Sequence, residues 1–339
     1  MEQEPIRFPS RYDYKHTALI DIAFNRILAL RGWTVTENTD LKEFVALLTK
    51  QKLDLQITFD LSNTEYIGLE QVGSLIIFGR FCHNVSGHKV KLVFPKLARL
   101  AENLLLPWNF FEFFSQWGEP ASPISDKGEP WPPYNSLPFT RIREISDVQR
   151  TARDLKKPKI EKILRETFNL DADQRNVLVD TIVSEVCDNI PFHSMSEGVV
   201  AVQLHVRSPM VVHLPSFYQP KIDIVISDGG IGILQSLRMR YPSVYSNKSA
   251  RDALNDVFSG SVPQPEGKSR GGIARTRNAI QAFGGIFEIR TPFSTGTCYP
   301  ERLNIRTDGR FFPGTHVKIK LPTPEPRGKE GVKYDSDPL

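Results

Sequence analysis

The sequence has few of the features that mark membrane, secreted or metal-dependent proteins. Its 339 residues include only three cysteines, Cys82, Cys187 and Cys298, which are too far apart for a zinc knuckle or a disulfide framework. No apolar run approaches the roughly 20 residues that span a membrane, and the charged N-terminus lacks a signal-peptide core. The formal net charge is only +4, so the charge balance neither indicates nor excludes nucleic acid. We therefore expect a cytoplasmic protein without membrane contact.

The residues that are present have the balance of a folded globular protein, with 40% hydrophobic and 24% charged side chains. The length is sufficient for two domains. Prolines gather between Glu119 and Pro138, and because proline removes a backbone donor and fixes φ, a regular element is not expected to persist there. We predict four parts: an N-terminal unit over 1–118, a linker over 119–145, a larger unit over 146–322 and a flexible tail over 323–339.

Hydrophobic periodicity predicts strands and helices in both units. In the first, the alternation from Leu53 to Phe59 predicts a strand, and the segments that follow predict a helix at 69–85, a strand at 89–94 and a helix at 97–106. In the second, Asp171 and Gln174 form a capping box for a long helix that ends near Phe192. Further strands are expected around 199–206, 221–227, 285–290 and 315–322. The predicted class is α/β, with a small sheet and helices first and a sandwich of a mixed sheet and helices second.

Polar residues on one predicted helix are the first indication of a ligand site. In the segment SEVCDNIPFH, Glu185, Asn189 and His193 recur every four residues and therefore share one helical face. A carboxylate and an amide are costly to bury without partners, so this face is either solvated or part of a site. A single histidine says little about catalysis, and His193 is more simply interpreted as a structural residue at the helix end.

The second indication is the segment KIDIVISDGGIGI. By the strand period of two, Asp228 shares one face with three isoleucines, so its carboxylate is predicted to lie in the layer that packs on the helices. The exocyclic amine of adenine is a suitable donor for such a carboxylate. Gly230 and Gly232 allow the backbone to turn sharply and to approach a ligand closely. An ordinary Asp-Gly turn between elements is the alternative.

The third indication is a glycine-rich basic stretch before a helix predicted to begin near Ile273: Gly267, Lys268, Arg270, Gly271 and Gly272. A helix N-terminus presents unpaired N–H groups and partial positive charge, which favour phosphate, and the basic side chains add charge-assisted contacts. The GKS at Gly267 is not a Walker loop, because that motif requires glycine where Val262 stands. A solvated basic loop is the alternative.

Taken in order, these segments and the closing GTHVKIKLP resemble the nucleotide-binding domain of GHKL ATPases, the family of histidine kinases, anti-sigma-factor kinases and gyrase. The resemblance covers about 146–322 and implies that the chain binds ATP and Mg²⁺. It implies that Asn189 ligates the metal and that Glu185 activates the attacking water or hydroxyl. It also implies the remaining roles: adenine recognition by Asp228, pocket shape by Gly230 and Gly232, pocket closure by Thr315, and phosphate binding by the lid from Gly267 to Gly272.

Four positions depart from the family pattern. Pro191 follows Asn189 where the family helix usually continues, and Phe192 takes a place often held by lysine or arginine. In the second glycine box, Ala274 stands where glycine is usual, and Arg275 where an apolar residue is usual. These departures concern lid closure more than nucleotide binding.

The N-terminal unit, through TFDLSNTEYIGLEQVGSLIIFGRFCHNVSGHKVKLVFP, resembles a STAS domain over about 53–114. Phosphorylatable STAS domains carry serine at the start of the helix, where this chain has Glu70, so the usual phosphorylation switch is not expected. Glu70 is interpreted either as a fixed negative charge at the helix N-terminus or, more simply, as an ordinary first-turn glutamate. The resemblance implies a protein partner for this unit.

Two functions of different class follow. In the first, the chain is a Mg²⁺-dependent regulatory enzyme in which Glu185 promotes ATP hydrolysis or phosphotransfer to a protein serine or threonine. In the second, it is a nucleotide-gated protein-binding module with little or no turnover. A sensor histidine kinase is not expected, because no phosphoacceptor helix precedes the ATPase-like unit. Nucleic acid is not expected either, since no dense basic patch contains interleaved aromatic residues. A homodimer through 145–170 stays open.

Overall fold

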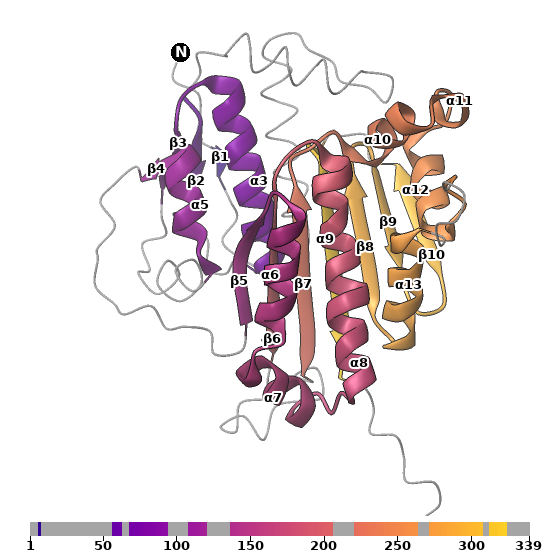
Figure 1. Cartoon of the computed structure of the whole chain (residues 1–339). Helices are drawn as coiled ribbons and strands as arrows, with labels where there is room; N and C mark the ends of the chain where they lie inside the picture. Colours follow the sequence, from indigo (N-terminus) through magenta and orange to yellow (C-terminus); the bar gives the residue numbers. More distant parts are fainter. Residues whose placement is uncertain are drawn as a thin grey trace, which may run out of the picture.

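The chain is described here from a computed structural model, over residues 6–7, 56–62, 68–93, 108–120, 136–205, 220–263, 271–307 and 312–323. These residues form two sheets, with helices between the sheets and on the outer face of the larger one (Figure 1). The predicted α/β class is confirmed. No helix within the described ranges is long and apolar enough to cross a membrane. The cysteines are free thiols, and all three are buried.

The small sheet is parallel. Its strands, in sheet order, are β1 (Ile6–Arg7), β2 (Thr58–Asp60), β3 (Val90–Val93) and β4 (Gly118–Pro120). Parallel neighbours need crossover connections, and helices α3 (Leu69–Ser86) and α5 (Phe110–Trp117) provide them. The helix predicted at 69–85 and the strand predicted at 89–94 are thus confirmed. The helix predicted at 97–106 lies outside the described residues.

The large sheet is antiparallel throughout its described strands. In sheet order these are β10 (Leu303–Thr307), β9 (Ser294–Cys298), β8 (Ile286–Thr291), β11 (Thr315–Pro322), β7 (Lys221–Asp228), β6 (Gly198–His205) and β5 (Ser136–Ile142). The four strands predicted for this unit correspond to β6, β7, β8 and β11. The sequence predicts a mixed sheet for this unit, but among the described strands parallel pairing occurs in the small sheet and antiparallel pairing in the large one.

Strand β5 occupies part of the stretch that the sequence assigns to the linker at 119–145. It pairs with β6 at the edge of the sheet, and the register shifts between Leu137 and Thr140. Pro138 lies within this shift. An edge strand tolerates proline because only one of its sides must supply ladder donors. The prolines therefore accompany an irregular edge strand over 136–142, where the sequence predicted no regular element.

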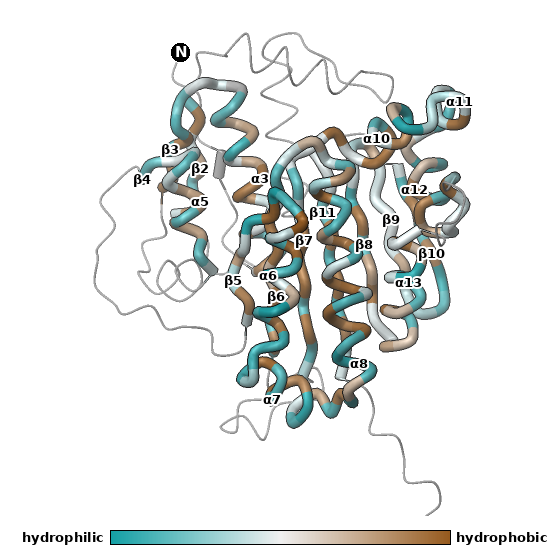
Figure 2. The backbone as a smooth tube through the Cα atoms, in the orientation of Figure 1, coloured by the Kyte–Doolittle hydropathy of each residue, from teal (hydrophilic) through white to brown (hydrophobic). Residues whose placement is uncertain are grey.

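Helices cover one face of the large sheet. Hydrophobic residues follow β7 (Figure 2), and buried apolar residues of the long helix belong to the same core. The helices after β5 are α6 (Ile145–Leu155) and α7 (Pro158–Glu166), and those after β7 are α10 (Gly232–Arg240), α11 (Pro242–Tyr245), α12 (Ala250–Ser259) and α13 (Gly272–Ala282).

The long helix between them begins as predicted, because the Asp171 carboxylate accepts the Gln174 N–H at 2.8 Å. It runs through α8 (Ala172–Asn176), η3 (Val177–Ser184), α9 (Glu185–Asn189) and η4 (Ile190–Ser194). Pro191 does not end the helix. The chain continues in a π-type turn to Ser194, beyond the end predicted near Phe192.

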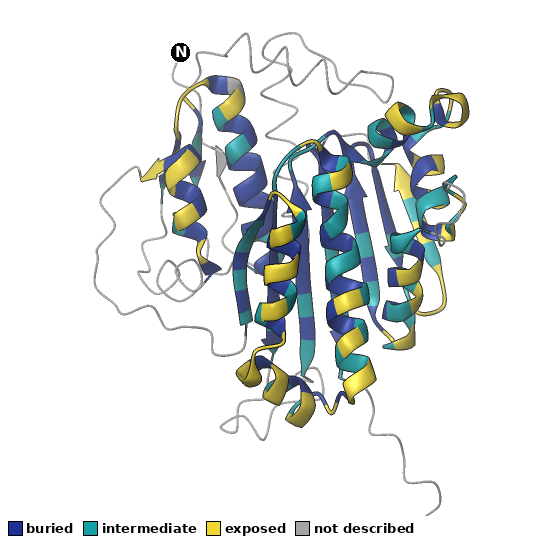
Figure 3. Cartoon of the chain, in the orientation of Figure 1, coloured by how far each residue is buried: buried dark blue, intermediate teal, exposed yellow. Residues whose placement is uncertain are grey.

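Helix α3 is shared between the two sheets. On one side Phe78 stacks on Phe59 of β2, with ring centroids 5.3 Å apart. On the other side, Gly73 approaches Val225 of β7 so closely that a Cβ on the glycine would lie 2.9 Å from Val225 Cγ1. Figure 3 shows α3 buried along most of its length. A helix that is apolar around its circumference must be covered on all sides, and here two sheets cover it.

An ion pair joins the start of α3 to the large sheet. Glu70 lies in the first turn of α3, and its carboxylate pairs with the Lys318 ammonium on β11. Although burial lowers the pKa of Lys318, the charge and hydrogen bond of Glu70 raise it above its usual value overall. Glu70 is therefore a first-turn glutamate whose charge is used in a contact between the two units.

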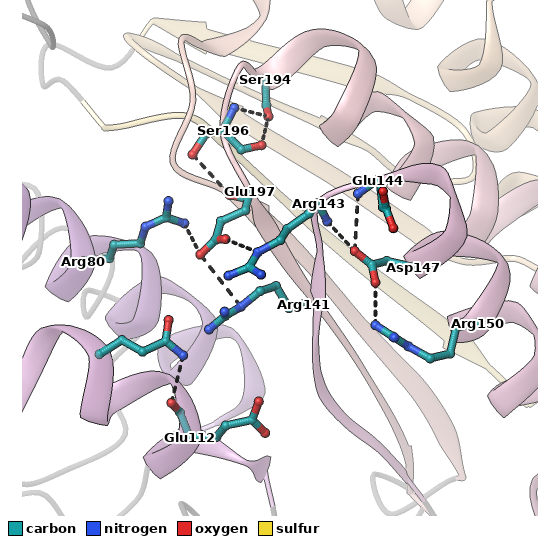
Figure 4. A network of polar contacts seen from close by, with 11 residues as sticks. Arg80, Glu112, Arg141, Arg143, Glu144, Asp147, Arg150, Ser194, Ser196 and Glu197 are labelled. Carbon is teal, nitrogen blue, oxygen red and sulfur yellow. Dashed lines mark hydrogen bonds and ion pairs between the residues drawn. The ribbon is translucent and has the colours of Figure 1, made fainter.

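A second polar contact joins the other end of α3 to β5 and β6 (Figure 4). Glu197, directly before β6, lies 2.7 Å from Arg80 Nη1 on α3, 2.7 Å from Arg143 Nε and 3.8 Å from Arg141 Nε. Burial acts to raise the pKa of Glu197, but the hydrogen bond from Arg143 and the charges of the three arginines lower it overall. One carboxylate thus holds three guanidinium groups from two parts of the chain.

Replacing Glu197 by glutamine is expected to lower the free energy of unfolding by about 2 kcal/mol, because three crowded arginines lose their common anion. The pKa of Glu197 is lowered in the folded state, so this contribution is present at neutral pH and is lost as the pH falls below about 4.5. Urea unfolding of both proteins at neutral and acid pH measures the effect. Glu166→Gln, in an exposed ion pair with Arg165, is the control and should change stability by less than about 0.5 kcal/mol. Equal effects of the two substitutions would contradict the prediction.

Candidate functional site

A cavity of about 210 Å³ opens between one end of the large sheet and the helices that cover it. Most of its lining is apolar and comes from the long helix, the sheet, α10, the end of α12 and the start of α13: Val186, Ile190, Ile226, Ile233, Leu237, Val257, Val262, Ile273, Ile289 and Val317. The polar side chains of the lining are fewer: Asn189, His193, Ser194, Asp228, Ser236, Arg240, Tyr241 and Thr315. An apolar slot with a few convergent polar groups is typical of a small-molecule site.

Asp228 is the buried acid of this cavity. It ends β7, is only 6% exposed, and lies on the strand face that the sequence predicts. Its Oδ1 accepts the backbone N–H groups of Gly230 at 2.8 Å and Thr315 at 3.3 Å. Burial raises the pKa of Asp228 to about 6, and hydrogen bonds from Gly230 and Thr315 oppose a larger rise. The second carboxylate oxygen receives neither backbone bond, although the Thr315 side chain also hydrogen-bonds the carboxylate. Because each carboxylate oxygen accepts more than one hydrogen bond, a ligand can still donate to it.

Three glycines around Asp228 have no room for a side chain. A Cβ on Gly230 would lie 2.0 Å from the Ser194 carbonyl oxygen. Gly232 has a φ of +75°, and its Cβ would lie 2.3 Å from Pro292 Cδ. Gly314 also has a φ of +75°, and its Cβ would lie 2.0 Å from the Asp228 carbonyl oxygen. The sequence predicted Gly230 and Gly232 but not Gly314, although Gly314 directly precedes Thr315.

Asn189 presents an oxygen to the same cavity. Its Nδ2 donates to the carbonyl oxygens of Glu185 at 2.7 Å and Val186 at 3.3 Å, so Oδ1 is left to face a ligand. Oxygen is the donor type that Mg²⁺ prefers. Within the described part of the chain, no group of three or more histidine, cysteine, aspartate or glutamate side chains could hold a metal ion. A cation here would therefore need the oxygens of a ligand and of water to complete its shell.

Glu185 lies beside the cavity rather than in its wall. Arg275, in the first turn of α13, donates from Nη2 to Glu185 Oε1 at 2.5 Å. Gly272 leaves space for the acid, since a Cβ there would lie 2.3 Å from Glu185 Oε2. The predicted base is thus ion-paired with a residue that the sequence marks only as a departure from the family pattern.

The helix N-terminus predicted to bind phosphate lies at this cavity. Helix α13 begins at Gly272, close to the predicted start, and both Gly271 and Gly272 line the cavity. The first N–H groups of a helix have no acceptor within it and are available to an anion. The lid residues Gly267, Lys268 and Arg270 lie outside the described residues.

Four polar lining residues were not predicted: Ser194, Ser236, Arg240 and Tyr241. Arg240 and Tyr241 follow one another at the end of α10, with the Arg240 guanidinium 5.6 Å from the centre of the Tyr241 ring. Burial and the nearby charge of Arg240 lower the pKa of His193, so the imidazole is neutral at neutral pH. His193, which the sequence analysis interprets as a structural residue at the helix end, also lines the cavity. No spacing pattern distinguishes Arg240 from Arg238, the other basic residue of α10.

The structure brings six predicted residues to one cavity: Asn189, Asp228, Gly232, Gly271, Gly272 and Thr315. Gly230 supports Asp228 through its N–H, and Glu185 lies next to Gly272. No protein-family model matches the chain, and a search of curated proteins finds no similar one. The chemistry of the site must therefore be argued from its own residues.

Proposed function

We propose that the chain is a regulatory protein that binds ATP with Mg²⁺ in this cavity, as a GHKL-type nucleotide-binding domain does. The observation that carries the proposal is a buried aspartate in an apolar slot next to a helix N-terminus. The second oxygen of Asp228 accepts the amine of adenine, and the apolar side chains enclose the ring. The start of α13, at Gly271 and Gly272, receives the phosphates.

Asn189 would hold the metal through Oδ1, because its amide nitrogen is already bonded to the helix. Bound Mg²⁺ would neutralise charge on the phosphates, and phosphate and water oxygens would fill the rest of its shell. The residues present fit such a metal. Asn189 would supply one neutral oxygen, and the nucleotide that brings the Mg²⁺ would supply the phosphate oxygens.

The proposed activity is hydrolysis of ATP, or transfer of its γ-phosphate to a protein serine or threonine, with Glu185 as the base. The second candidate, a nucleotide-gated binding module, is favoured by the bond from Arg275 to Glu185, which occupies the base. The STAS-like unit packs on the ATP-binding unit through α3 and Glu70, so any separate protein partner in the cytoplasm would bind that unit elsewhere.

Release of ADP from ATP by the purified chain, with and without Mg²⁺, tests the activity. Glu185→Gln is expected to lower the rate about 100-fold while ATP still binds, because a general base contributes at least that factor. Asp180→Asn on the same helix, in an exposed ion pair with Lys156, is the matched control and should have no effect. Transfer of labelled γ-phosphate to a protein would identify a kinase. Binding without ADP release would support the module, and absence of binding would refute the proposal.

A further inference from the structure

The geometry points to Arg275 as the residue that distinguishes a nucleoside triphosphate from a diphosphate, a role that rests on the proposed function. Arg275 donates a hydrogen bond to Glu185. We infer that a bound γ-phosphate takes the Arg275 guanidinium from Glu185 and so frees the acid. A diphosphate leaves the pair intact.

The position of Arg275 fits this role. It lies in the first turn of α13, next to the glycines that line the cavity, where the proposed phosphates meet the helix N-terminus. The side chain of Arg275 is 49% exposed and that of Glu185 is 28% exposed, so the pair lies at the boundary between cavity and solvent. Part-exposed ion pairs of this kind contribute little to stability, and breaking one costs little.

The backbone around the pair is held by packing, so Arg275 changes its bonding partner by moving its side chain alone. Thr276 Oγ1 donates to the Thr181 carbonyl at 3.0 Å and holds α13 against the long helix. Ala274 and Ile280 of α13 are buried. Gly272 keeps Glu185 within reach of the helix, since any larger residue would displace the carboxylate.

A bound triphosphate would gain from a second cationic side chain beside the cavity. Among the described lining residues Arg240 is the only lysine or arginine, and it lies at the end of α10 rather than on α13. A triphosphate carries more negative charge than a diphosphate, and the planar guanidinium forms paired hydrogen bonds with phosphate oxygens. The exchange replaces one charge-assisted bond, to a carboxylate, by another to the γ-phosphate.

Calorimetry on the full chain with Mg²⁺ tests the exchange, using a non-hydrolysable ATP analogue and ADP as the two ligands. Arg275→Ala is expected to weaken binding of the analogue about tenfold and that of ADP less than twofold. Arg277→Ala is the matched control on the same helix, because the Arg277 guanidinium donates to Asn278, its neighbour in the chain. It should change neither affinity.

A double-mutant cycle tests whether Glu185 competes for the arginine. Glu185→Gln is expected to strengthen binding of the analogue several-fold, since Arg275 is then already released, and to have no such effect when Arg275 is alanine. Equal losses for analogue and ADP in Arg275→Ala, or the same effect of Glu185→Gln in both backgrounds, would overturn the inference and leave the proposed function standing. If the unsubstituted chain binds neither ligand, it is the proposed function that fails.

Discussion

Replacing Asp228 by asparagine is expected to weaken adenine-nucleotide binding at least about 100-fold. The buried NH₂ group of the asparagine would then face the amine of adenine, so two donors would meet without an acceptor. The asparagine can keep its oxygen for the N–H groups of Gly230 and Thr315, which both bond to Oδ1 of the acid. Its NH₂ group then stands where the second carboxylate oxygen would accept the adenine amine. Calorimetry with ADP at neutral pH measures the loss.

The pH dependence of the same binding provides a second measurement of this effect. The pKa of Asp228 is raised to about 6 in the folded chain, so the carboxylate that accepts the amine is lost as the pH falls below that value. The affinity ratio of the unsubstituted chain to Asp228→Asn should therefore fall at acid pH, and this ratio cancels the titration of the phosphates themselves.

The raised pKa also has a consequence for stability. Protonated Asp228 stabilises the fold relative to the ionised form, and this contribution is lost as the pH rises from 3.8 through about 6. Above that interval Asp228→Asn should be at least as stable as the unsubstituted chain. A residue that costs stability where it is ionised is typical of a binding site.

Asp223→Asn is the matched control for these measurements. Asp223 is on the same strand but on the other face, where it bonds to His205 at 2.8 Å and Lys221 at 3.1 Å. Its replacement should leave nucleotide affinity unchanged. If both substitutions reduced affinity equally, Asp228 would have no special place in the site.

Gly314→Ala is expected to destabilise the chain by about 4 kcal/mol or more, through strain and a backbone clash together. The φ of Gly314 is +75°, and an added Cβ would lie 2.0 Å from the Asp228 carbonyl oxygen and 2.7 Å from the Gly230 nitrogen. Neither atom can move without displacing the turn that holds Asp228. The free energy of unfolding in urea, or loss of folded protein, measures the effect.

Gly284→Ala separates the two causes. Its φ is +68°, but the nearest atom to an added Cβ is Pro322 Cγ at 3.8 Å. This substitution should cost only the left-handed strain, about 1 kcal/mol. A loss at Gly314 no larger than that at Gly284 would show that the turn adapts to the clash.

Local sequence pattern was sufficient for much of the large unit. The period of two in 221–227 placed Asp228 on the face that β7 presents to the helices. The capping box at Asp171 set the start of the long helix, and the glycines before Ile273 marked the start of α13. These features depend on residues that are close together in the chain, so a short stretch of sequence is enough to predict each of them.

Other features depend on which distant segments meet, and only the tertiary structure decided them. Helix α3 could be predicted as apolar, but not that two sheets would share it. Nothing within α9 or α13 indicates that Arg275 reaches Glu185, or that Gly314 must leave room for the Asp228 carbonyl. A helix period or a turn motif acts over a few residues, whereas an ion pair or a steric limit between elements exists only once the chain has packed.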